Sequence, residues 1–267
     1  MNLTFTLATT DKNGETLPNP GVEYIQWPES YPIDCEAFME DNSGEYVKYL
    51  WDPNSYINIM VYNFTTEPNS NSVTLGISHI PFSTTGKHYL EGLGETDYSH
   101  LTLANLQFPL SVSINSLYIN EESTPTEYST ADIAVTLAHE LGHYLGLHHV
   151  FAETDNGTCE DTDYCKDTKS YNKQEYDSKC DYIYENEREK YTFKNLVKRT
   201  GCDGIEFISY NIMDYAISYS NQFTQNQRER IRHVLSYSPL IPGPKKGDID
   251  TRALNEGPLD LPIRTIK

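Results

Sequence analysis

The sequence predicts an α+β fold, on three observations. Short β-rich runs occupy the first half of the chain, two amphipathic helical patterns follow, and a polar, cysteine-bearing segment lies between those two helices. The 267 residues suit one large domain or two small ones, and 37% hydrophobic with 22% charged residues is a globular composition. No run of about 18 apolar residues occurs, so we expect no membrane-spanning segment.

Four strands are expected in the first half, because these runs are rich in β-branched and aromatic residues or alternate apolar with polar side chains. They are residues 3–7, 56–62, 72–80 and 111–119. Pro81 stops the third run, as a residue that cannot donate to a β-ladder. Residues 35–50 have a weaker pattern and are expected to be partly helical.

Residues 132–147 carry the clearest helical pattern, with apolar side chains recurring every three or four positions. Ser129 or Thr130 supplies the expected N-cap, and Asp132 adds negative charge in the first turn. Gly146 is a stop signal near the end of the pattern.

A second helix is expected from Thr224 onward. The sequence from Thr224 to Gln227 reads T-x-x-Q, a capping box, and an apolar stripe follows it. Pro239 and the prolines after it end the helix, because proline cannot continue one. The tail, residues 241–267, is rich in proline, glycine and charge and is expected to extend over the surface.

The formal net charge of −19 disfavours nucleic acid as a partner, since phosphates require lysine and arginine. Residues 1–150 hold 19 acidic and three basic side chains, a net of −16. This half of the chain favours cationic partners or substrates, and solubility alone is the alternative explanation.

Four of the five cysteines lie within 44 residues, namely Cys159, Cys165, Cys180 and Cys202. Their clustering in a polar segment favours two disulfides and an oxidising compartment, with three pairings open. A four-thiolate zinc site is the alternative, and the absence of any C-x-x-C pair argues against it. We expect residues 152–204 to be irregular and held by these cross-links, and Cys35 to be a free or unassigned thiol.

The decisive stretch is residues 139–149. On a helix, His139 and His143 lie at i and i+4 on one face, where two imidazoles can hold one metal ion. Glu140 lies about 100° round the helix, close enough to reach a metal-bound water without being a ligand. Gly146 lets the chain turn back and present His149 as a third ligand. Three imidazoles leave a fourth position open, as in catalytic zinc sites.

Chance alone produces this full pattern in roughly one such chain in thirty thousand. The alternative, a helix that merely carries surface histidines, is therefore weak. His148 is the nearest rival ligand, but the spacing favours His149, and we expect His148 to lie outside the ligand set or at the surface.

This stretch resembles the metzincin zinc peptidases, whose signature H-E-x-x-H-x-x-G-x-x-H is followed by a methionine-containing turn. Residues 210–215, which include Met213, form a candidate turn. Within the metzincins, residues 145–151, 213–215 and 223–224 are similar to the pappalysin family. The likeness touches most of residues 3–237, and it is weakest over residues 152–204.

The resemblance implies a zincin or metzincin-like fold. Such a fold has a twisted, mostly parallel sheet with the active-site helix, an irregular C-terminal subdomain, and a zinc cleft between them. It implies a catalytic domain at residues 1–240, with an upper subdomain at 1–149 and a lower one at 150–240, followed by the tail.

For function, the resemblance implies a zinc-dependent endopeptidase acting on proteins or peptides. Zinc lowers the pKa of its bound water, and Glu140 takes the proton of that water as general base. Tyr215 matches the position whose phenol stabilises the tetrahedral intermediate, with core packing as the alternative for this tyrosine. Met213 is expected to form an apolar floor beneath the zinc.

Substrate is expected to pair antiparallel with an edge strand above the cleft, for which residues 75–80 are the candidate and an interior strand is the alternative. Enzymes of this family often prefer a basic residue just after the cleaved bond. We also expect a monomer, and a secreted or cell-surface protein whose export signal or lipid anchor is absent from this chain.

A structural calcium ion is a further implication of the resemblance, since oxygen ligands follow the active-site helix. The candidate ligands are Asp155, Glu160, Asp161, Asp163 and Asp167. They do not follow the EF-hand pattern, and a solvated acidic loop is the alternative.

Two other functions are compatible with the motif. One is an adhesion or binding module that keeps the fold without hydrolysis, against which the intact Glu140 and Tyr215 argue. The other is a zinc hydrolase of a non-protein amide, which the same chemistry could serve.

Overall fold

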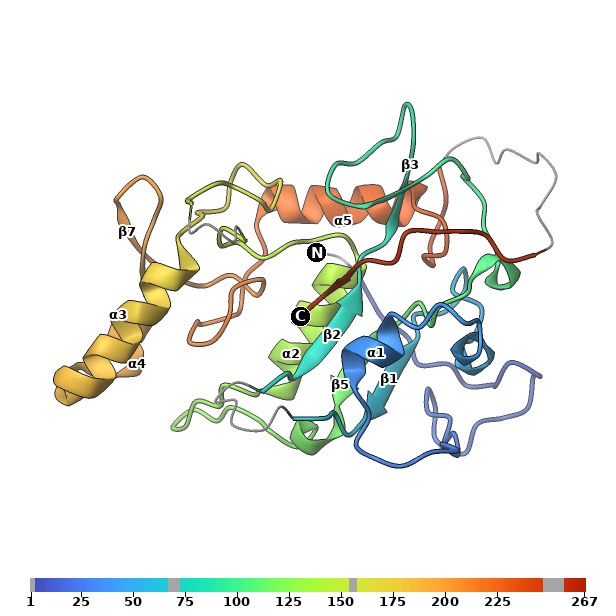
Figure 1. Ribbon diagram of the computed structural model, residues 1–267, viewed down its shortest axis with the longest axis horizontal. Coiled ribbons are helices and arrows are strands. Elements are labelled where there is room, and N and C mark those ends of the chain that lie inside the picture. Colours follow the sequence, from blue (N-terminus) through green and yellow to red (C-terminus); the bar gives the residue numbers. More distant parts are fainter. Residues whose placement is uncertain (1–2, 67–72, 154–157, 247–256) are drawn as a thin grey trace.

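The α+β fold is confirmed. The computed structural model describes residues 3–66, 73–153, 158–246 and 257–267. Its main sheet has four strands in the order β1 (Ile59–Tyr62), β5 (Val112–Asn115), β2 (Gly76–His79) and β8 (Thr265–Ile266). The sheet is mixed, because β1 and β5 are parallel while β2 is antiparallel to both of its neighbours. Helix α2 (Ile133–Tyr144) packs along β2, as Figure 1 shows.

The remaining elements surround this sheet and helix (Figure 1). The helices are α1 (Cys35–Met39), α3 (Lys173–Asn186), α4 (Phe193–Leu196) and α5 (Gln225–Tyr237). Two small sheets pair β3 (Phe82–Thr84) with β4 (Gly94–Thr96), and β6 (Lys198–Thr200) with β7 (Glu206–Ile208). Short 3-10 turns lie at Tyr46–Tyr49, Leu103–Asn105, Ser116–Tyr118 and Arg188–Lys190. Within the described ranges, no helix is both long and apolar enough to cross a membrane.

The N-cap of helix α2 lies two or three residues after the expected N-cap positions. Asp132 is the N-cap, and its carboxylate accepts hydrogen bonds from the backbone N–H groups of Ala134 and Val135 at 3.0 and 3.2 Å. The prediction of Ser129 or Thr130 was therefore wrong. A carboxylate at the N-cap satisfies two otherwise unpaired donors, which a hydroxyl two or three residues earlier cannot reach.

The C-terminal end of α2 follows the expected glycine signal. Gly146 has φ of +91°. Its N–H donates to the His143 carbonyl at 2.8 Å, and the Leu147 N–H donates to the Gly142 carbonyl at 2.9 Å, which together form a Schellman motif. A Cβ at Gly146 would also lie 2.7 Å from Val234 of α5. The sharp reversal and the close packing of α5 both require glycine here.

Helix α5 has the expected capping box. Thr224 accepts from the Gln227 N–H at 3.2 Å, and the Gln227 side chain accepts from the Thr224 N–H at 2.9 Å. The helix ends at Tyr237, before Pro239, as expected. Its apolar residue Ile231 packs into the main core.

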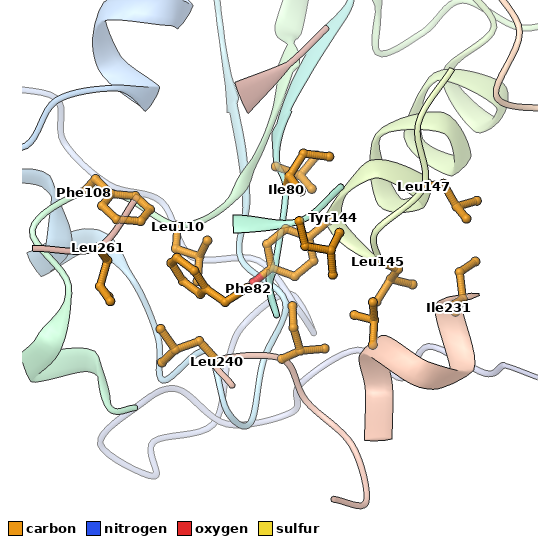
Figure 2. Packing of buried hydrophobic residues seen from close by; sticks show 14 of the residues in the cluster. Ile80, Phe82, Phe108, Leu110, Tyr144, Leu145, Leu147, Ile231, Leu240 and Leu261 are labelled. Atoms are coloured by element: carbon orange, nitrogen blue, oxygen red, sulfur yellow. The ribbon is translucent and has the colours of Figure 1, made fainter. Parts of the chain in front are cut away.

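The main core fills the space between the sheet, the end of α2 and α5. Figure 2 shows side chains from these elements converging, with Leu145 and Leu147 facing Ile231 of α5. Ile241 and Leu261 join the same cluster from the tail and are almost fully buried. We expected the tail to extend over the surface, but part of it is packed into the main core. Part of it, residues 247–256, lies outside the described residues.

Three of the four expected strands form, each shorter than its sequence run. They are β1, β2 and β5. Ser72, which opens the third run, lies outside the described residues. Residues 3–7 form no strand: Phe5 and Leu7 are 59% and 68% exposed, and this segment pairs with no other described strand. A segment with an alternating pattern forms a strand only if a partner strand and a buried face are available to it.

The segment at residues 152–204 is more regular than expected. It contains the 14-residue helix α3, which Asn172 caps by accepting from the Glu175 N–H at 3.1 Å. The helix is polar on most sides, so its apolar periodicity is too weak to identify it from sequence. Residues 35–50 are partly helical, as expected, through α1 and the turn at Tyr46–Tyr49.

Only one of the two expected disulfides forms among the described residues. Cys159 is bonded to Cys202, while Cys165 and Cys180 are free. Cys180 lies within α3, and Cys165 is buried before that helix begins, so the two thiols sit in separate environments. Cys35 is a free, buried thiol in α1, as expected.

His79 ties β2 to α1. Its Nε2 donates to the Met39 carbonyl at 2.9 Å, and its Nδ1 accepts from the Ser111 N–H at 3.2 Å. The ring is fully buried, and burial lowers the pKa of His79 to about 4. Its neutral form is therefore part of the folded structure over the whole physiological range.

We predict that acidification destabilises the fold through His79. The pKa is lower in the folded than in the unfolded chain, so the stabilisation is present above about pH 6.5 and is lost as the pH falls towards 4. Between pH 7.5 and pH 5 this single group should cost about 2 kcal/mol. Urea unfolding measures the drop in the free energy of unfolding between pH 7.5 and pH 5. This drop should be about 2 kcal/mol smaller for His79→Gln than for the wild type. The control is His100→Gln, at a half-buried histidine, which should show the same drop as the wild type. Equal drops in the wild type, His79→Gln and His100→Gln would contradict the role of His79.

Candidate functional site

Three buried histidines converge on one point. His139 and His143 come from successive turns of α2, and His149 comes from the chain that returns after Gly146. Their Nε2 atoms lie 3.0 Å apart for His139 and His143, and 3.2 Å apart for each of these with His149. Their exposed fractions are 8%, 0% and 1%.

The other ring nitrogen of each histidine fixes which nitrogen carries the proton. His139 Nδ1 lies 2.7 Å from the Ile212 carbonyl oxygen, and His143 Nδ1 lies 2.9 Å from that of Leu147. His149 Nδ1 contacts the carboxylate of Glu153. Carbonyl and carboxylate oxygens only accept hydrogen bonds, so each Nδ1 must be the donor. The three Nε2 atoms are therefore unprotonated, and their lone pairs face one another.

This arrangement fits a metal ion. Burial lowers the pKa of all three histidines, and the neighbouring imidazoles lower those of His143 and His149 further, so the rings are neutral ligands. Nitrogen ligands of a tetrahedral zinc ion lie about 3.3 Å apart, given zinc–nitrogen distances of 2.0–2.1 Å. Ligating histidines also typically donate their second N–H to a carbonyl or carboxylate, as all three do here.

Glu140 lies beside this cluster and under strand β2. Its side chain is 3% exposed, and a Cβ placed on Gly76 would come within 2.5 Å of its Cγ and 2.6 Å of its Oε1. Its Oε2 has no hydrogen-bond partner within the described part of the chain. Burial raises the pKa of Glu140 well above its usual value. A buried, unpartnered carboxyl group is costly for folding alone, which is typical of a group kept for chemistry.

The turn containing Met213 supports the cluster from below. Met213 is fully buried, and its sulfur would lie 2.4 Å from a Cβ on Gly142 of α2. Its carbonyl accepts from the Val150 N–H at 3.1 Å, which holds the returning chain that carries His149. The Asn211 side chain caps the turn by accepting from the Met213 N–H at 2.9 Å. Only a glycine on the facing turn of α2 permits this approach.

Two polar pairs anchor the same turn. Asn211 and Gln227 of α5 exchange two hydrogen bonds at 3.0 and 3.1 Å, so the capping-box glutamine also fixes the turn. Asp214 is buried, accepts from the Tyr171 hydroxyl at 2.6 Å and pairs with Arg199 at 3.3 Å. The local sequence marks Asp214 only as part of the motif, because its partners Tyr171 and Arg199 lie far away along the chain.

Tyr215 stands at the rim of the cluster. Its ring centroid lies 4.6 Å from that of His149 and 6.0 Å from that of His139. Its hydroxyl donates to the main-chain carbonyl oxygen of Lys267. Burial raises the pKa of Tyr215, so the phenol stays a hydrogen-bond donor at neutral pH.

His148 and Glu153 are the two residues that neighbour the motif in sequence. His148 is buried, but its Nε2 lies 3.0 Å from the Gly92 carbonyl, and the ring points away from the cluster. Glu153 holds His149, and nothing in the sequence marked it, because a lone acidic residue four positions on has no distinctive spacing.

The candidate calcium ligands do not form a cluster in the described chain, where the three histidines are the only group of metal-binding type. Asp155 lies outside the described residues. Asp163 is buried, and burial raises its pKa to about 7. Its Oδ1 accepts from the Cys165 N–H at 2.8 Å, which gives this carboxyl a structural role in the loop.

The candidate substrate strand, residues 75–80, does not have a free edge. Strand β5 pairs with one side of β2, and β8 pairs with the other through Ser78↔Ile266 and His79↔Thr265. The expectation of an open edge was therefore wrong for this arrangement. The reason is the tail, whose return to the sheet has no local sequence signal.

A family model described as pregnancy-associated plasma protein-A, peptidase M43, matches residues 40–236. This span is most of the chain. The chain belongs to the M43 (pappalysin) family of metallopeptidases. The resemblance inferred from the motif is thus confirmed, and the motif that contains His139, His143 and His149 lies within the matched span.

Curated relatives match a shorter part of the chain. Extracellular metalloproteases of Arthroderma benhamiae and Trichophyton verrucosum are each 37% identical over 97 residues, which is 36% of this chain and 29% of theirs. The extracellular metalloprotease of Arthroderma otae is 38% identical over 97 residues, which is again 36% of this chain and 29% of that protein. The match therefore spans less than a third of the length of these fungal relatives.

Two solved structures are similar to this chain. Mirolysin in complex with compound 9 is 19% identical, with a TM-score of 0.53, over 96% of this chain and 74% of that one. Mature mirolysin of Tannerella forsythia, in complex with a cleaved peptide, is 21% identical, with a TM-score of 0.49, over 86% and 70%. The first of these likenesses indicates a metzincin-like fold for this chain.

We predict that Gly76→Ala destabilises the protein through Glu140. The new methyl group would overlap the buried Glu140 side chain, at an expected cost of about 1–3 kcal/mol in the free energy of unfolding. In a Glu140→Ala background the overlap disappears, so the same change should cost little. Urea unfolding of the four proteins measures this coupling.

Gly257→Ala is the matched control, since a Cβ there meets nothing within 4 Å. Equal costs of Gly76→Ala with and without Glu140 would mean that β2 and Glu140 are not packed as described.

Proposed function

We propose that this chain is a zinc-dependent endopeptidase, secreted or exposed at the cell surface, with His139, His143 and His149 as zinc ligands. The observation that carries the proposal is the convergence of three unprotonated Nε2 atoms in a buried site, beside a buried carboxyl group whose Oε2 has no hydrogen-bond partner in the described part of the chain. Membership of a metallopeptidase family supports protein or peptide substrates. The extracellular naming of the fungal relatives supports export.

The chemistry divides among a few residues. Zinc bound by the three histidines supplies Lewis acidity that makes water a nucleophile near neutral pH. Glu140 takes the proton of the attacking water and delivers it to the amine nitrogen as the carbon–nitrogen bond breaks. Tyr215 donates a hydrogen bond to the oxygen of the attacked carbonyl, where negative charge develops. Met213, packed against Gly142, keeps water from the back of the site.

The proposed catalytic domain is residues 1–240, with a zinc cleft between the upper subdomain at 1–149 and the lower one at 150–240. Strand β2 and α2 belong to the upper part, and the Met213 turn belongs to the lower part. A structural calcium ion, a monomeric state and a basic residue just after the cleaved bond are further proposals that rest on the family resemblance.

We predict that Glu140→Gln abolishes peptide cleavage while zinc stays bound. Removing the general base should lower kcat/KM by at least about a hundredfold. A mixed peptide library and a denatured protein, analysed by mass spectrometry, measure cleavage, and elemental analysis measures zinc. A chelator should stop the wild type, and added zinc should restore it.

Glu127→Gln, at an exposed carboxyl group, is the control and should cleave like the wild type. Equal cleavage by Glu140→Gln and the wild type would remove the peptidase proposal. A wild type that binds zinc but cleaves no peptide would favour a binding module or a hydrolase of a non-protein amide.

We predict that Tyr215→Phe lowers kcat by about a hundredfold with a smaller change in KM, because the lost hydrogen bond acts mainly in the transition state. Steady-state kinetics on a single peptide substrate measures both constants. Zinc content should not change. A purely structural role for the ring would instead leave kcat intact, since phenylalanine keeps the packing against His149.

A further inference from the structure

A segment of the chain itself lies where a peptide would add to the sheet. Strand β8 pairs antiparallel with β2, and the Ile80 N–H donates to the Arg264 carbonyl at 2.9 Å. In Figure 1 this dark red segment lies alongside β2. An extended peptide binds a sheet edge through the same antiparallel main-chain hydrogen bonds. Residues 264–267 therefore indicate how an extended substrate would lie along β2.

Lys267 lies beside the two residues proposed to carry the chemistry, Glu140 and Tyr215. Continuing the β8 register by one residue places it across from Ile77, next to Gly76, which packs on the Glu140 carboxyl group. The Tyr215 hydroxyl donates to the Lys267 carbonyl oxygen. Since Tyr215 is proposed to bind the oxygen of the attacked carbonyl, Lys267 occupies the position of the residue just before the cleaved bond.

The side chains of the segment meet one face of α1. Alternate residues of a strand point to the same side, so the side chains of Thr265 and Lys267 point together. The Lys267 ammonium pairs with Glu36, and the Thr265 hydroxyl donates to Glu40 at 2.8 Å. Glu36 and Glu40 are four residues apart and thus neighbours on one helical face.

Helix α1 is held firmly enough to form the wall of a binding subsite. Asp34 caps it by accepting from the Ala37 N–H at 3.0 Å, and the Met39 carbonyl is bonded to His79 of β2. Phe38 packs on Tyr62 of β1, with ring centroids 5.3 Å apart. The helix that carries Glu36 is thus fixed to the strand that would bind the substrate main chain.

We propose that Glu36 is a specificity-determining residue that selects a lysine or arginine immediately before the cleaved bond. This inference rests on the proposed peptidase function and on the role of Tyr215 in it. Residues 264–267 occupy the same subsites within the chain, and a substrate displaces them. The position differs from the family preference for a basic residue just after the bond.

The size of the preference follows from the exposure of the pair. The side chains of Lys267 and Glu36 are both 50% exposed. A solvent-exposed ion pair of this kind favours one substrate over another by up to about fivefold, and salt screens it. The preference for a basic residue should therefore weaken at high ionic strength.

Two peptides test the proposal, identical except for lysine or norleucine just before the cleaved bond, each preceded by Thr-Ile. The full chain should cleave the lysine peptide with about fivefold higher kcat/KM. Glu36→Gln should bring the ratio of the two kcat/KM values close to one. Competition by residues 264–267 affects both peptides equally and cancels in the ratio.

Glu45→Gln is the matched control, because Glu45 is an exposed carboxyl group of the same half of the chain whose ion pair is with Lys48. It should keep the wild-type ratio. A third peptide carries lysine only just after the cleaved bond. The masses of its products show whether cleavage occurs before or after lysine, and so distinguish the two preferences. The proposal is overturned if the wild type shows no preference for lysine before the bond, or if Glu36→Gln keeps it.

Failure of the peptidase function gives a different result. If the wild type cleaves none of the peptides, fluorescence-labelled lysine and norleucine peptides are bound instead to the Glu140→Ala chain. A ratio of dissociation constants near five that falls to one with Glu36→Gln supports the subsite without hydrolysis. Equal affinities overturn it. Unchanged thermal unfolding of Glu36→Gln excludes misfolding as the cause.

Discussion

The structure around the site depends on one constraint, which is that three buried imidazole rings keep unprotonated Nε2 atoms within 3.2 Å of one another. Facing lone pairs repel, so the rings stay in place only if each is anchored elsewhere or a cation lies between them. The anchors are a carbonyl in the Met213 turn, the carbonyl of Leu147 after α2, and the Glu153 carboxylate. They come from separate segments, and so the geometry of the trio is set by how α2, the turn and α5 pack.

Strand β2 joins this site to the rest of the fold. At one end Gly76 lies directly over Glu140, and at the other His79 binds α1. Its two edges are occupied by β5 and β8. A single four-residue strand therefore positions the proposed base, the acidic helix and the strand-pairing surface. Glycine is needed at position 76, where the strand crosses α2, because the Glu140 carboxyl group beneath leaves no room for a Cβ.

The sequence predicted that three histidines converge, and it predicted only part of the fold. Residues 139–149 and the capping box at Thr224 combine strong local periodicity with local chemistry, and the structure has α2 and α5 where these patterns lie. The strand expected at residues 3–7 and the second disulfide failed because each needs a partner that the local sequence does not specify. Helix α3 was missed because a polar helix carries no apolar stripe.

By itself, the sequence determined that two histidines share a helical face, that Gly146 turns the chain back, and that a third histidine follows at the right distance. Backbone geometry over a few turns is a local property, and 3.6 residues per turn leaves little choice. The tertiary structure alone decided which groups hold the far side of each ring, that Glu140 is buried with no hydrogen-bond partner for its Oε2 among the described residues, and that residues 264–267 return to β2. These contacts join residues separated by up to 231 positions, and they exist only because packing of the core brings those segments together.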